Sequence, residues 1–159
     1  MPDNFLYYLL LAGILLVAAF LFYISVKYRN RELEMDDLEG HEFENYCADI
    51  LRQSGFLEVE VTKGSGDYGV DILASREGIS YAIQCKCYDK PVGVKAVQEA
   101  YAGRDYYDRM VGAVMTNQYF TAPATECAKK LKILLWDRGY IDSMLEENKG
   151  QKNGRRNKG

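Results

Sequence analysis

The chain has few of the side chains from which metal sites with nitrogen and sulfur ligands are built. Its 159 residues include one histidine, His41, and four cysteines, Cys47, Cys85, Cys87 and Cys127. None of the cysteines belongs to a CxxC motif, whereas zinc sites usually draw on closely spaced Cys and His ligands. The sequence therefore does not support a zinc site. We interpret the cysteines as reduced, mostly buried thiols.

The chain also lacks an excess of positive charge. Its formal net charge is −3 and its pI is near 5.3, so the composition does not indicate nucleic-acid binding. Contacts with DNA would need local basic patches. One such patch is the C-terminal tail, residues 148–159, which is basic, contains no acidic residue and is predicted to be disordered. The tail could contact DNA phosphates or anionic lipid, or it could merely keep the chain soluble.

Charge is absent altogether from the stretch between Phe5 and Val26. As a helix this stretch would span about 33 Å, which matches the hydrocarbon core of a bilayer. Lys27, Arg29 and Arg31 follow it, and a basic excess on that side favours a cytoplasmic location for the rest of the chain. A cleaved signal peptide is the alternative, but the acidic start, the apolar length and the missing small-residue cleavage site argue against it.

These features divide the chain into segments. We expect a transmembrane helix that anchors the protein in the cell membrane by a single pass, a charged connector, a folded cytoplasmic domain and the basic tail. The predicted boundaries are an N-terminus over 1–4, the transmembrane helix over 5–26, the connector over 27–39, the domain over 40–147 and the tail over 148–159.

The predicted domain alternates between helical and strand patterns. Helices are predicted over 41–54, 93–107, 121–130 and 140–145, and strands over 57–62, 110–115 and 133–136 and on both sides of a turn at 76–78. In the first strand, Leu57, Val59 and Val61 are expected to face the core. This order of elements predicts an α/β fold with a central mixed β-sheet flanked by helices.

The stretch from Gly64 to Lys86 contains the most informative pattern. Its glycine-rich start allows close backbone approach to a ligand, and Asp67 in it is interpreted as a turn residue or a partner of a metal ligand. Alternation on the strand that follows places Asp71 opposite its apolar neighbours. On the next strand, the same period of two puts Gln84 and Lys86 side by side.

A hairpin would bring the face of Gln84 and Lys86 against the strand that carries Asp71. A carboxylate, an amide and an ammonium on one sheet face do not suit a hydrophobic core, but they suit a divalent metal and a phosphate. The alternative is a cross-strand ion pair between Asp71 and Lys86 that has no function.

These residues resemble the active-site signature of Mrr-type restriction endonuclease domains, which belong to the PD-(D/E)xK nuclease superfamily. The resemblance covers roughly residues 40 to 145. Val70 stands where the superfamily often has proline, and Gln84 stands where it often has an acidic residue. Gln84 is usual in the Mrr branch. The motifs are Gly69-Val70-Asp71-Ile72 and Gln84-Cys85-Lys86, with His41-Glu42-Phe43-Glu44, Gly66-Asp67-Tyr68-Gly69, Val97-Gln98-Glu99 and Thr116-Asn117 around them.

The resemblance implies a restriction-endonuclease-like core that uses Mg²⁺. Asp71 is the first candidate metal ligand, Glu44 the second and the backbone carbonyl of Cys85 the third. Gln84 would orient a metal-bound water without adding charge. Lys86 would position or deprotonate the attacking water, or stabilise the developing charge.

The resemblance also places a glutamine of the following helix, Gln98, in the active site. For Glu44 and Gln98 the alternative is a position on a helix surface without a catalytic role.

The resulting hypothesis is a membrane-anchored, Mg²⁺-dependent endodeoxyribonuclease that hydrolyses DNA phosphodiester bonds. A role in restriction or defence is implied by the resemblance. The alternative is a catalytically inactive, membrane-tethered module that binds DNA or another protein. The expected partners are DNA, the membrane and a second copy of the chain, because two sites are usually needed to cut both strands.

Overall fold

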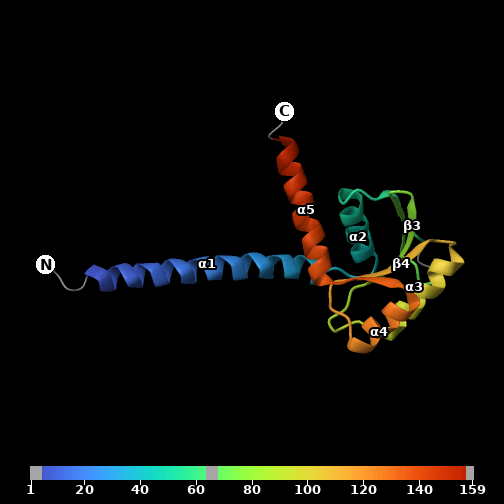
Figure 1. Ribbon diagram of the computed structural model, residues 1–159, viewed down its shortest axis with the longest axis horizontal. Helices are drawn as coiled ribbons and strands as arrows, with labels where there is room; N and C mark the ends of the chain where they lie inside the picture. Colours follow the sequence, from blue (N-terminus) through green and yellow to red (C-terminus); the bar gives the residue numbers. More distant parts are fainter. Residues whose placement is uncertain (1–4, 64–67, 157–159) are drawn as a thin grey trace. The chain divides into compact units, whose positions relative to one another are not determined.

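The computed structural model describes residues 5–63 and 68–156, and of residues 5, 6, 9, 26–34 and 151–156 it describes the backbone alone. Residues 1–4, the loop Gly64–Asp67 and residues 157–159 lie outside the description, and so does the predicted role of Asp67. The chain forms two compact units, Met1–Asp37 and Leu38–Gly159, each of which can be followed in Figure 1. The predicted domain boundaries stay predictions.

The first unit contains a single helix, α1, Phe5–Asp36. Most of its described apolar side chains, among them Leu10, Leu16 and Phe22, are exposed, whereas Met35 near its end is buried. Among residues 5–63 and 68–156, none of the helices combines the length and the apolar character that crossing a membrane requires. The transmembrane helix predicted over residues 5–26 is therefore not supported by the structure.

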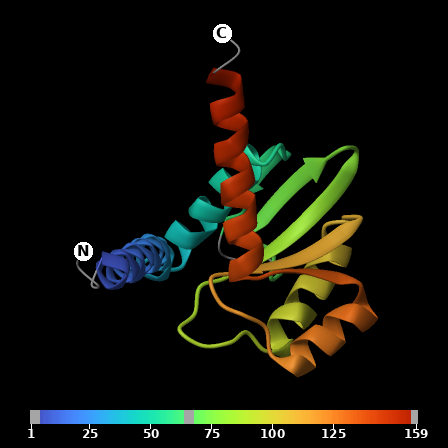
Figure 2. The same ribbon diagram turned by 60° about the vertical axis from the view of Figure 1, so that its left-hand side comes forward.

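The second unit is built on a five-stranded sheet with the strand order β1-β2-β3-β4-β5. The first three strands pair antiparallel, and β3, β4 and β5 pair parallel. The predicted mixed sheet is therefore confirmed (Figure 2). The strands are β1, Leu57–Val61; β2, Ile72–Arg76; β3, Ile79–Lys86; β4, Val111–Thr116; and β5, Ile133–Trp136.

Helices cover both faces of this sheet. They are α2, His41–Gln53; α3, Val94–Tyr106; α4, Ala122–Leu131; and α5, Arg138–Arg156. In both ribbon views α3 and α4 lie on one face, and α2 and α5 lie on the other. Because successive side chains of a strand point to opposite faces, neighbouring residues of β3 reach different helices.

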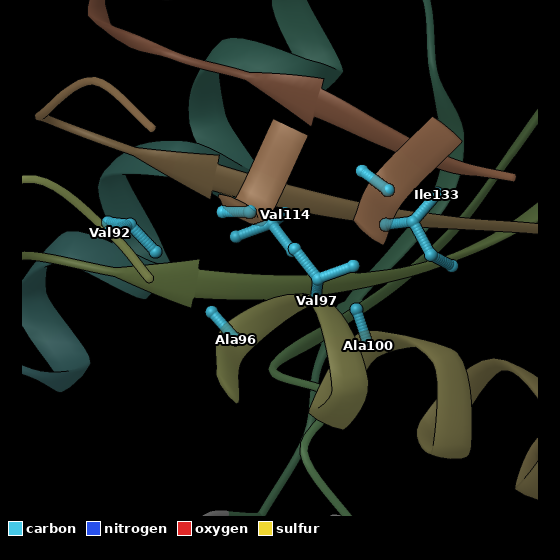
Figure 3. Close-up of a cluster of buried hydrophobic side chains, with 8 residues drawn as sticks. Val92, Ala96, Val97, Ala100, Val114 and Ile133 are labelled. Atoms are coloured by element: carbon cyan, nitrogen blue, oxygen red, sulfur yellow. The ribbon is translucent and has the colours of Figure 1, made fainter. Parts of the chain in front are cut away.

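The core on the side of α3 and α4 is made of small and β-branched side chains. Val97 and Ala100 of α3 pack on Val114 of β4 and Ile133 of β5 (Figure 3). Small residues let α3 approach the sheet closely, because a Cβ at Gly103 would lie 2.3 Å from Val70 Cγ2. This close approach places α3 directly beside the hairpin formed by β2 and β3.

The structure corrects the prediction that the apolar residues of β1 face the core. Leu57 is 65% exposed, and Val59 and Val61 are only half-buried. β1 is an edge strand, and its register with β2 shifts between Leu57 and Glu60. The irregularity includes Glu58, whose φ is +51°, so alternation fails to predict which residues face the core.

The last helix is longer than the sequence predicts. α5 ends at Arg156, not at Leu145, and thus enters the segment predicted to be disordered. Asn148 is buried, and its Nδ2 donates a hydrogen bond of 3.0 Å to Ser54 Oγ at the end of α2. This tertiary contact anchors α5 although its composition is polar.

Candidate functional site

The hairpin brings Asp71 and Gln84 together at the end of β2 nearest the glycine-rich loop. Asp71 directly precedes β2, and its backbone N–H donates to the carbonyl of Ile83, 2.9 Å away. Asp71 thereby lies beside the residue that precedes Gln84 on β3. The period of two therefore predicted this juxtaposition correctly.

The Asp71 carboxylate is held by two donors of β3. Its Oδ2 accepts a hydrogen bond from Gln84 Nε2 and another, 2.6 Å long, from the backbone N–H of Cys85. Asp71 is 8% exposed and Gln84 is 4% exposed. A buried carboxylate is costly unless donors or cations surround it, so these bonds fix its position and offset part of its desolvation.

The other end of the Gln84 amide is not satisfied. Gln84 Oε1 is buried and has no hydrogen-bond partner among the described residues. A buried acceptor without a partner costs about 1–3 kcal/mol, and a bound cation would remove this cost. A Cβ at Gly69 would lie 3.1 Å from Gln84 Oε1, so glycine at this position keeps the space beside that oxygen open.

Lys86 occupies the same face of β3 as Gln84 and pairs with a glutamate of α3. Lys86 Nζ lies 3.0 Å from Glu99 Oε2, and both side chains are largely buried. Burial lowers the pKa of Lys86, but the hydrogen bond to Glu99 and its negative charge outweigh burial and raise this pKa overall. Lys86 is therefore a cation at neutral pH.

Gln98, the α3 residue that the resemblance places in the active site, is the chain neighbour of Glu99. Gln98 is exposed on α3, whereas Glu99 contacts Lys86. At 3.6 residues per turn, Gln98 lies nearly opposite the buried residues Ala96 and Ala100. The spacing of these small residues is the sequence signal that points to Glu99.

A cavity of about 140 Å³ lies beside Lys86 at the start of α3. Two lysines and a tyrosine contribute to its wall, and Glu99 lies between the two ammonium groups, since Lys95 Nζ is 3.7 Å from Glu99 Oε1. The half-buried Lys86 thus borders an open space on the side of α3. The cavity is lined by Lys86, Tyr88, Val92, Gly93, Lys95, Ala96 and Glu99.

Glu44 approaches the site from α2. Its side chain is 21% exposed, and its Oε2 lies 2.6 Å from His41 Nδ1. The charges of both Asp71 and Glu44 raise the pKa of Cys85, so both carboxylates lie near the same residue of β3. Glu44 is therefore a partly buried residue and not a solvated one. It is not among the hydrogen-bond partners of Gln84 described above.

The surroundings of Cys85 favour the neutral form of its thiol. A hydrogen bond with Cys47 raises the pKa of Cys85 first, and burial and the charges of Cys47, Asp71 and Glu44 raise it further. A neutral thiol binds metal weakly, so the contribution of Cys85 would come from its backbone. All four cysteines are free, with Cys47 and Cys85 buried and the other two half-buried, which agrees with the interpretation as reduced thiols.

The donor set fits a hard divalent cation. Among the described residues there is no group of three or more His, Cys, Asp and Glu side chains arranged to hold a metal ion. A carboxylate, an amide oxygen and a backbone carbonyl nevertheless present the oxygen ligands that Mg²⁺ prefers. The unpartnered Gln84 Oε1 beside Asp71 is the observation that supports this fit.

Solved structures resemble this chain, and the first two given below, with TM-scores above 0.5, share its fold. A protein of unknown function, AF1548, matches with a TM-score of 0.56 at 26% identity over 65% of this chain and 64% of its own. The DNA modification-dependent restriction endonuclease AspBHI matches with a TM-score of 0.52 at 20% identity over 66% of this chain and 30% of its own. The EndoMS–dsDNA2 complex has a TM-score of 0.43 at 18% identity over 59% of this chain and 43% of its own. The chain thus spans less than two thirds of each of these structures.

No curated protein matches the chain. The family model Mrr_cat, described as restriction endonuclease, matches residues 35–145. This match covers more than half of the sequence and includes Asp71, Gln84 and Lys86. The α/β domain is therefore restriction-endonuclease-like, and the chain belongs to the Mrr_cat family of restriction endonucleases.

Proposed function

We propose that this chain is a Mg²⁺-dependent endodeoxyribonuclease that hydrolyses phosphodiester bonds of DNA, with a role in restriction or defence. The observation that carries the proposal is the pairing of Asp71 with Gln84, whose amide oxygen Oε1 is buried without a hydrogen-bond partner among the described residues. The AspBHI fold and the Mrr_cat match support DNA as the substrate. A second copy of the chain would supply the second site for cutting both strands.

Asp71, Gln84 Oε1 and the backbone carbonyl of Cys85 would hold the cation, and Glu44 would add a second carboxylate from α2. When bound, a divalent cation neutralises charge that develops on the phosphate and lowers the pKa of a coordinated water. The Gln84 Nε2 and Cys85 N–H groups keep the Asp71 carboxylate oriented. Gln84 adds no charge to the site.

Lys86 would act as a cation and not as a general base. Its raised pKa leaves it protonated at neutral pH, so its ammonium can donate a hydrogen bond to the attacking water or to a phosphate oxygen. Glu99 holds the ammonium in place. Of the roles that the sequence left open for Lys86, the geometry favours positioning and charge stabilisation.

The direct test is cleavage of supercoiled plasmid DNA by the full chain. We expect nicked and linear products with Mg²⁺ and none with EDTA, and we expect Lys86→Ala to abolish both products. Salt-dependent DNA binding without Mg²⁺-dependent cleavage would favour an inactive DNA-binding module. A lack of DNA binding would favour a protein-interaction module.

Replacement of Glu99 by glutamine should change the pH dependence of cleavage. The substitution removes the charge that raises the pKa of Lys86 and leaves the burial that lowers it. The alkaline limb of the kcat/KM profile should therefore move to lower pH. Glu99→Asp keeps the negative charge, so its alkaline limb should move less than that of Glu99→Gln. An unchanged profile in Glu99→Gln would show that Lys86 does not have to be protonated.

Location in the cell membrane, with the second unit in the cytoplasm, stays a prediction from the uncharged stretch between Phe5 and Val26. Fractionation checks it, because an anchored chain stays in the membrane pellet after an alkaline wash. Recovery in the supernatant would contradict this location and leave the nuclease proposal unaffected.

A further inference from the structure

Two tyrosines form a stacked pair on the surface of the second unit. The ring centroids of Tyr68 and Tyr106 lie 3.8 Å apart at an interplanar angle of 25°. Their exposed fractions are 58% and 56%. Tyr107 packs edge-on against Tyr106, with centroids 5.0 Å apart. The pair thus holds aromatic surface in a defined orientation although more than half of it is open to solvent.

The backbone ties this tyrosine pair to the proposed active site. Gly69 and Val70 connect Tyr68 to Asp71, and a Cβ at Gly69 would lie 2.9 Å from Glu99 Cβ and 3.1 Å from Gln84 Oε1. A Cβ at Gly103 would lie 2.9 Å from the carbonyl oxygen of Tyr68. The segment that carries Tyr68 is therefore packed between α3 and the residues of the site.

Tyr106 is placed relative to the site by α3 itself. Glu99, which holds Lys86, and Tyr106 are two turns apart on the same side of this helix. At 1.5 Å per residue the two positions are separated by about 10 Å along the axis. This separation is within reach of a nucleotide that flanks a phosphate bound at Lys86.

The surroundings of the pair favour a nucleobase over a phosphate. Asp108 is exposed two residues from Tyr106, and its carboxylate disfavours a bound phosphate there. The nearby guanidinium of Arg104 is occupied, since its Nη2 lies 2.8 Å from Asp105 Oδ1 and its Cζ lies 4.7 Å from the centroid of the Tyr101 ring. Aromatic rings stack on any base without needing positive charge.

We propose that Tyr68 and Tyr106 form a stacking platform for an unpaired nucleobase of the DNA strand that is bound at Lys86. The proposal rests on the proposed function, since it assumes that DNA occupies the site. Bases inside a duplex are already stacked on their neighbours, so the platform would take a base from single-stranded DNA or one that has left the helix. The site would therefore favour substrates that contain unpaired nucleotides.

The test compares two labelled single strands of equal length by fluorescence anisotropy, with the full chain in EDTA. One strand is oligothymidylate and the other consists of abasic nucleotides, which keep the phosphates and lack the bases. We expect tighter binding of oligothymidylate. Tyr68→Ala and Tyr106→Ala should each weaken this binding by between about 5-fold and about 150-fold and leave binding of the abasic strand unchanged.

Two further variants separate stacking from other effects. Tyr106→Phe keeps the ring and should bind as the unsubstituted chain does. Tyr140, which is 45% exposed and stacks on Trp136, forms a comparable pair elsewhere in the unit, so Tyr140→Ala should leave both affinities unchanged.

Equal affinity of the unsubstituted chain for the two strands would overturn the proposal, and so would an equal loss for both strands in the Tyr68 and Tyr106 variants. Dissociation of a dimer by Tyr106→Ala in sedimentation experiments would also overturn it, because a second copy would then occupy the platform.

Plasmid cleavage is measured separately from DNA binding. Cleavage without selective loss of oligothymidylate binding would refute the platform alone, and selective loss without cleavage would refute the nuclease proposal alone.

Discussion

Asp71→Asn should lower kcat for plasmid cleavage by more than about 10³-fold. Asp71 is the buried carboxylate proposed to hold the cation, and asparagine keeps its shape but removes its charge. A divalent cation contributes several kcal/mol of charge stabilisation. Because each 1.36 kcal/mol changes the rate tenfold, loss of this contribution gives an effect of the expected size. Quantification of nicked and linear plasmid over time measures it.

The fold should tolerate this substitution. An asparagine oxygen in the place of Oδ2 can still accept both hydrogen bonds, from the Cys85 N–H and from Gln84 Nε2. We therefore expect the free energy of unfolding to change by no more than about 1 kcal/mol. Asp49→Asn, which changes an exposed aspartate of α2, is the matched control and should cleave normally. Normal cleavage by Asp71→Asn would refute the assignment of Asp71.

The contact between Asp71 and Gln84 was predictable, because the two-residue alternation of side chains along neighbouring strands determines it. The hairpin of β2 and β3 has a regular register from Ile72 opposite Ile83 to Arg76 opposite Ile79. Alternation along two such strands fixes which side chains meet. For this reason the sequence predicted the contact of Asp71 with Gln84. Thr121 likewise caps α4 as its residue type predicts, with its side chain accepting from the Ala124 N–H at 3.3 Å.

The partner of Lys86 was not predictable in the same way. It comes from α3, and its identity depends on how this helix is rotated against the sheet. The resemblance that selects Gln98 does not reveal this rotation. Gly103 does, because its missing side chain lets α3 pack on Val70, and Glu99 lies one turn before Gly103. Packing of small residues, more than charge or family motif, thus determines which polar side chain reaches the site.

Gln84→Glu should destabilise the chain without metal and make its stability depend on Mg²⁺. The new carboxylate would replace the amide that donates to Asp71 Oδ2 and would be buried beside a like charge. An uncompensated buried charge costs about 3–5 kcal/mol, so the melting temperature in EDTA should fall by on the order of 10 °C. Thermal unfolding followed by circular dichroism measures this change.

The sign of the pH dependence follows from the same contact. Burial and the charge of Asp71 would raise the pKa of the new carboxyl group in the folded state above its unfolded value of about 4.3. The destabilisation should therefore be small near this unfolded pKa and should grow as the pH rises to 7.

Mg²⁺ should reverse the loss, because it binds the folded state, and saturation at about 100 times Kd contributes about 2.7 kcal/mol. Gln98→Glu makes the same chemical change at an exposed position of α3 and should change stability little under either condition. If Mg²⁺ raised the melting temperature of Gln84→Glu no more than that of Gln98→Glu, Asp71 and Gln84 would not share a cation. The oxygen-ligand site at the start of β2 would then have to be abandoned, whatever the cleavage assays showed.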